Sequence, residues 1–150
     1  MTTQTQTSLQ VRRVINAPRE KVFQAFTDPA LIGRWYHPGP MRTEVRKWDA
    51  TQGGTFDIAM IADEGEMAGT HEAHGTFQAV EAGRKLVHTW SWKSDDPNMN
   101  GESVVTVELK DADGGTEVIL THERLPNKES VESHTHGWVG CLENLVALYA

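Results

Sequence analysis

The chain has 150 residues, a length typical of a single domain whose hydrophobic core is large enough to stabilise it. It carries 14 lysines and arginines against 21 aspartates and glutamates, and the net charge of −7 disfavours a nucleic-acid partner, because the phosphate backbone is also negative. Its one cysteine, Cys141, excludes an intramolecular disulfide, and its apolar runs are too short for membrane insertion.

The first part of the chain predicts a tail, a strand and two short helices. Residues 1–8 are polar and lack the pattern of a signal peptide, so we expect a flexible tail ahead of one soluble, cytoplasmic domain at residues 9–150. Hydrophobic residues alternate imperfectly in LQVRRVI (9–15), as in a strand. APREKVFQAF (17–26) and DPALIGRWY (28–36) have helical spacing with an early proline, and Asp28 is a typical N-cap.

From residue 41 onward the hydrophobic period changes to two, which predicts strands. The clearest segments are GGTFDIAMI (53–61), KLVHTWSWK (85–93), ESVVTVELK (102–110) and TEVILTHE (116–123). Two more strands are expected at 42–48 and 70–80, where the alternation is too poor to assign faces. The turn-forming segments ADEGE, SDDPNMNG and DADGG separate neighbouring strands, which indicates an antiparallel meander.

The chain ends in one long predicted helix that starts after Asn127, a typical N-cap. His134 and Trp138 share its apolar face, whereas His136 lies on the opposite side, because each residue advances about 100° around a helix. Gly137 weakens the helix, which would be explained by close approach of a strand or of a bound molecule. An α+β fold follows, in which the helix lies across the apolar face of the sheet.

The histidine pairs of the sequence do not predict a metal site. His134 and His136 lie on opposite sides of the helix, and His71 and His74 on opposite faces of a strand, so neither pair can share one ion. No nucleophile motif or phosphate-binding loop is present in the sequence. Cys141 stands among leucines without a charged neighbour and is expected to be a small core residue. We expect no metal and no cofactor.

Several histidines and tryptophans are expected to face the space between sheet and helix. They are His88, Trp90 and Trp92 of one strand, His122 of another, and His134 and Trp138 of the helix. Two interpretations remain open at this point. They are core residues hydrogen-bonded within the protein, or they line a ligand cavity, since binding sites are commonly apolar with a few convergent polar groups.

Four segments together resemble one known family. They are INAPREKVFQAFTDPALIGRW, GGTFDI, HGTFQAVEAGRKLVHTW and TEVILTHERLPNKESVESHTHGWVGCLENL. The chain is similar, from about residue 9 onward, to proteins related to the activator of the heat-shock protein 90 ATPase (AHSA-like), within the START/Bet v 1-like (SRPBCC) superfamily. The resemblance implies a helix-grip fold, a curved antiparallel sheet of six to seven strands around a long C-terminal helix, with a cavity between them.

The resemblance also implies which residues would contact a ligand. Trp35 would cover the cavity mouth. The full predicted ligand-binding set is Trp35, Phe56, Ile58, Met60, His88, Trp90, Trp92, His122, His134, Trp138, Cys141 and Leu142.

Three functions compete at this point. The first is a protein that binds a small hydrophobic or aromatic molecule, such as a lipid or polyketide. The second is an enzyme of cyclase, dehydratase or hydrolase type with His88, His122 or His134 as acid–base, since an imidazole titrates near neutral pH. The third is a co-chaperone-like interaction module in stress response.

Overall fold

The computed structural model describes residues 7–65, 68–94, 96, 99 and 101–150. Residues 1–6 of the predicted tail, and parts of the predicted turns at 62–66 and 94–101, lie outside the described residues. The elements in chain order are β1 (Leu9–Ile15), α1 (Arg19–Thr27), α2 (Pro29–Trp35), β2 (Arg42–Trp48), β3 (Thr55–Ala62), β4 (Gly69–Glu81), β5 (Lys85–Trp92), β6 (Glu102–Ala112), β7 (Gly115–Glu123) and α3 (Lys128–Leu148).

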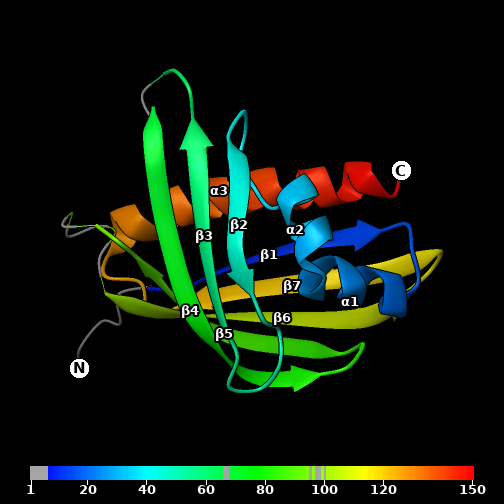
Figure 1. Cartoon of the computed structure of the whole chain (residues 1–150). Coiled ribbons are helices and arrows are strands. Elements are labelled where there is room, and N and C mark those ends of the chain that lie inside the picture. Colours follow the sequence, from blue (N-terminus) through cyan, green and yellow to red (C-terminus); the bar gives the residue numbers. More distant parts are fainter. Residues whose placement is uncertain (1–6, 66–67, 95, 97–98, 100) are drawn as a thin grey trace, which may run out of the picture.

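The strands form one antiparallel sheet in the order β1-β7-β6-β5-β4-β3-β2. Figure 1 shows that this sheet curls strongly and that α3 runs along its concave side. Register shifts between Val45 and Lys47, and between Phe77 and Ala79, contribute to the curl, because a bulge bends the strand that contains it. The expected helix-grip fold, with two short helices after the first strand, is confirmed.

Local sequence signals explain where the helices begin. The Asp28 carboxylate accepts a hydrogen bond from the Ala30 backbone N–H at 2.9 Å, and the Asn127 side chain accepts one from Ser130 N–H at 2.9 Å. Both N-caps were predicted from residue type, since such side chains satisfy N–H groups that lack a partner in the first turn. Among the described helices, none is long and apolar enough to cross a membrane.

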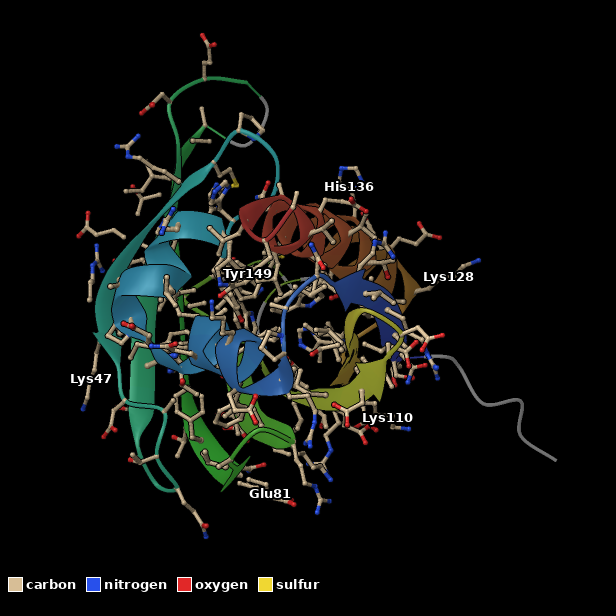
Figure 2. The ribbon with its side chains drawn as sticks, turned by 90° about the vertical axis from the view of Figure 1, so that its right-hand side faces the viewer. Lys47, Glu81, Lys110, Lys128, His136 and Tyr149 are labelled. Atoms are coloured by element: carbon tan, nitrogen blue, oxygen red, sulfur yellow. The ribbon has the colours of Figure 1, made fainter. Side chains whose placement is uncertain are left out.

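The predicted strand faces also match the structure. Phe56, Ile58 and Met60 of β3 and His88 and Trp90 of β5 are all buried against the interior. Figure 2 looks along the fold from one end, where side chains fill the space between α3 and the sheet. On the outside, His136 points away from the sheet, as the helical spacing predicted.

The loop at residues 37–40 packs directly on the backbone of α3. A Cβ atom added at Gly140 would lie 3.2 Å from the Gly39 nitrogen and 3.3 Å from the Pro38 Cα. At Gly137 it would lie 3.9 Å from the Pro38 Cβ. The Asn144 side-chain amide donates to the His37 carbonyl at 2.8 Å and holds the loop in place. The structure does not show the expected close approach of a strand at Gly137, where a Cβ would have ordinary room; the close approach is that of the loop at Gly140.

The two helix glycines give a matched pair of predictions. Gly137→Ala should raise the free energy of unfolding by up to about 1 kcal/mol, because alanine favours helix and its Cβ has ordinary room. Gly140→Ala should be clearly less stable than Gly137→Ala, because its Cβ would press on the backbone of the loop. Urea denaturation of both variants measures the difference. Equal stability would show that the loop does not press on α3.

Candidate functional site

The interior between the sheet and α3 contains a continuous set of aromatic and imidazole rings. Neighbouring ring centroids in this set lie 5.0 to 6.4 Å apart, mostly in tilted or edge-on arrangements. Such arrangements are favourable for aromatic side chains. We call this set the aromatic interior; its members are Tyr36, Trp48, Phe56, Phe77, His88, Trp90, Trp92, His122, His134 and Trp138.

His122 on β7 connects α3 to two further strands. The Trp138 indole N–H donates to His122 Nδ1 at 3.0 Å, so Nδ1 is an acceptor and the ring proton of the neutral imidazole is on Nε2. Nε2 then donates to the Ser103 hydroxyl at 2.7 Å, and that hydroxyl donates to the Trp90 carbonyl at 3.1 Å. Both ring nitrogens of His122 are therefore occupied by protein groups.

His134 on α3 is held in a similar way. The Trp92 indole N–H donates to His134 Nε2 at 3.0 Å, which places the ring proton on Nδ1. Nδ1 in turn donates to the Ser130 carbonyl at 2.7 Å. The ring centroids of His122 and His134 lie 5.0 Å apart, so two protonated imidazoles here would repel each other.

His88 differs from the other two histidines. Its Nδ1 donates to the Thr89 carbonyl at 2.9 Å, and the structure records no hydrogen bond from the described residues to its Nε2. Burial lowers the pKa of His88 to about 4. Burial, and then the nearby His134 and His88, lower the pKa of His122, and burial lowers that of His134. All three imidazoles are neutral at pH 7.

Trp90 at the centre of the aromatic interior has an indole N–H without a hydrogen-bond partner among the described residues. The other indoles are all paired. Trp35 donates to the Ala25 carbonyl and Trp48 to the Phe26 carbonyl, both at 2.9 Å, while Trp92 and Trp138 donate to histidines. Trp90 is only 2% exposed, and a buried donor without a partner needs an explanation.

Tyr36 is a member of the aromatic interior that sequence reasoning did not identify. Its ring contacts those of Trp48, Trp90 and Trp138, and burial raises the pKa of its phenol well above the usual value. It is the last residue of the predicted helical segment 28–36 and directly follows α2 in the structure, and the adjacent Trp35 was the only available signal. Burial likewise raises the pKa of Cys141, which suits a core residue rather than a nucleophile.

The other predicted ligand-binding residues are also buried. Trp35 is fully buried, and its recorded ring contacts are with Phe26 and Tyr36, one ring away from Trp90. Ile58, Met60, Cys141 and Leu142 belong to the same core cluster. The structure therefore brings the predicted residues together around one interior; their contact with a ligand stays a prediction.

Two hollows lie on the outer surface. One, of about 610 Å³, lies beside Arg19 and Asp111, and another, of about 360 Å³, beside Asp57, His74 and Lys93. Neither is lined by α3. Within the described part of the chain, no group of three histidine, cysteine or acidic residues is placed to hold a metal ion.

Fold and interior together define a helix-grip protein with a buried aromatic and imidazole centre. A sequence profile of the family described as activator of Hsp90 ATPase homolog 1-like protein matches residues 16–150. The chain belongs to this family, which confirms the resemblance noted in the sequence. No match was found among curated proteins.

Solved structures of similar fold cover almost the whole chain. Protein CV1439 from Chromobacterium violaceum is 26% identical with a TM-score of 0.85, over 95% of this chain and 96% of that one. The AHSA1 protein from Silicibacter pomeroyi is 24% identical with a TM-score of 0.80, over 93% and 95% of the two chains. Protein MLL2253 from Mesorhizobium loti is 26% identical with a TM-score of 0.71, over 94% and 95%.

The buried neutral histidines predict a loss of stability in mild acid. The pKa of His88 is about 4 in the folded protein and about 6.5 when unfolded, so below pH 6.5 the unfolded chain binds more protons. Stability present above pH 6.5 is lost as the pH falls toward 4. Between about pH 6.5 and 5, the titration of His88 alone should lower the free energy of unfolding by about 2 kcal/mol. The titration of His122 and His134 should add to this loss.

Urea denaturation at several pH values between about 7 and 5 measures this dependence. His88→Phe, which removes the titrating group but keeps a ring, should flatten the profile. The matched control is His136→Gln, because His136 is exposed and its removal should leave the profile unchanged. An unchanged profile in His88→Phe would contradict the assignment of the acid sensitivity to this residue.

Proposed function

We propose that the protein binds a small hydrophobic or aromatic molecule in the interior between the sheet and α3. The observation that carries the proposal is the unpartnered Trp90 N–H among the packed rings of the aromatic interior. A fully packed structural core normally pairs such a group, whereas a binding site keeps a few polar groups for its ligand. Membership of the family is consistent with this function.

The hydrogen bonding of His122 and His134 makes these two histidines unsuitable as general bases. A general base must present a free ring nitrogen to the substrate. Both nitrogens of His122 and of His134 are engaged with Ser103, Trp138, Ser130 and Trp92. These two imidazoles position the indoles that surround Trp90, and they act here as parts of the scaffold.

The aromatic rings contact one another, so a ligand must displace some of them or open a path from the surface. The loop at residues 37–40 is the proposed path. It joins α2 to β2, covers α3 at Gly137 and Gly140, and directly follows Tyr36, whose ring contacts Trp90 and Trp138. Movement of this loop would carry Tyr36 with it and uncover the centre of the interior.

Trp138→Ala should weaken ligand binding by at least about tenfold, because Trp138 packs edge-on against Trp90 and holds His122 in place. Titrations of planar aromatics, sterols and fatty acids, followed by indole N–H resonances and calorimetry, measure binding. The substitution should also cost about 3–5 kcal/mol of stability, so Trp138→Phe serves as a milder second variant.

Leu109→Ala is the matched control for lost stability. Leu109 is buried on β6, four residues beyond Val105, the partner of His122, and its truncation should cost about 2–5 kcal/mol. This variant should keep the ligand affinity of the original protein. Full affinity in folded Trp138→Ala, or an equal loss in Leu109→Ala, would contradict binding at the proposed place.

A further inference from the structure

We propose that Trp90 Nε1 and His88 Nε2 together recognise a phenolic hydroxyl, so that the ligand is a planar aromatic molecule with a neutral hydroxyl group. This inference rests on the proposed function and names the ligand class for the same interior. In the assignment, the ligand oxygen accepts from the Trp90 N–H and its proton is donated to His88 Nε2. Three features of the interior support it: the unpaired N–H of Trp90, the acceptor nitrogen of His88 and the absence of charged groups among the described buried side chains.

The first step is that none of the described neighbours of Trp90 accepts a hydrogen bond from its N–H. The rings around it belong to Tyr36, Phe56, Trp92, Trp138 and the histidines. The rings of His88 and His122 both lie 6.2 Å from that of Trp90, and Nδ1 of His122 already accepts from Trp138. Re-pairing His122 with Trp90 would therefore only transfer the missing bond to another buried indole, at the same unfavourable cost.

The second step concerns the lone pair of His88. His88 and Trp90 lie two residues apart on β5, so their side chains share the inner face, and their ring centroids are 6.2 Å apart. Because Nδ1 donates to the Thr89 carbonyl, the proton of the neutral ring is on Nδ1 and Nε2 is an acceptor. A donor on Trp90 and an acceptor on His88 thus belong to neighbouring rings on the same face of β5. A hydroxyl can satisfy both groups, whereas a carbonyl can satisfy only the donor.

The third step is the charge of the surroundings. The buried polar side chains of the described residues are histidine, serine and threonine, and none of them carries a formal charge at pH 7. A carboxylate or phosphate would lose its hydration there without a cation to replace it. A neutral hydroxyl on a flat ring loses little and stacks against the indoles, which favours a phenol over an aromatic acid.

The test compares 2-naphthol with naphthalene, which has the same rings without the hydroxyl. Calorimetric titration of the full chain should show about 3- to 10-fold tighter binding of 2-naphthol, the usual net effect of a hydrogen bond. In Trp90→Phe this preference should disappear, whatever the change in overall affinity. Leu109→Ala is the control: it truncates a buried side chain on β6 that makes no side-chain hydrogen bond, so the preference for the hydroxyl should persist.

A third probe, 2-methoxynaphthalene, can accept from Trp90 but has no proton for His88 Nε2, so its affinity should fall between the other two. In the original protein, 2-naphthol should also shift the Trp90 indole N–H resonance downfield, and naphthalene should not. This measurement does not require Trp90→Phe to fold.

Two results separate the failure of this inference from that of the proposed function. Equal binding of 2-naphthol and naphthalene, without a downfield shift, would overturn the hydroxyl site and leave the binding function intact; an ordered water would then satisfy Trp90. No binding of any of the three probes, nor of the sterols and fatty acids, would overturn both.

Discussion

The hydrogen bond from Trp138 to His122 is the interaction on which the interior of this protein depends. It joins α3 to β7, and it fixes the ring proton of His122 on Nε2. That proton then directs the imidazole to Ser103 on β6, whose hydroxyl bonds the Trp90 carbonyl on β5. One tautomer thus links the long helix to three strands. Protonation of Nδ1 would place two N–H groups opposite each other and break the chain of bonds.

Low polarity and close spacing keep this network neutral. His122 and His134 lie 5.0 Å apart, so a charge on either disfavours a charge on the other, and burial opposes both. The engaged nitrogens make these imidazoles rigid supports for Trp92 and Trp138. Among the described residues, Trp90 on β5 is the buried indole left without a hydrogen-bond partner, and the recorded hydrogen bond of the neighbouring His88 uses only its Nδ1. A polar spot of this kind within aromatic walls suits the selection of an oriented, flat ligand.

The loop at residues 37–40 joins α2 to β2 and packs on the backbone of α3. It contacts α3 through the glycine backbone and through the Asn144 amide, so few interactions would have to break for it to move. Tyr36 at its start forms part of the aromatic interior itself. Because the loop is joined directly to Tyr36, the proposed path to the interior would couple access to the arrangement of the central rings.

The sequence by itself determined the element types, the two N-caps at Asp28 and Asn127, and the inward faces of His88, Trp90, His122, His134 and Trp138. Backbone geometry imposes periods of two and 3.6 on any chain, so these features are local and readable. The family resemblance was also carried by contiguous motifs and is confirmed by the match over residues 16–150.

Only the tertiary structure decided which hydrogen bonds these side chains make. Trp90 and Trp138 look equivalent in the sequence, yet one N–H is paired and the other is not, because pairing depends on Ser103 and His122 from other strands. Tyr36 joined the interior from an irregular helix end, and Gly140 met Pro38 across about a hundred residues of chain. Distances between segments so far apart are set by how the sheet curls around α3, and hydrophobic periodicity along the chain does not encode them.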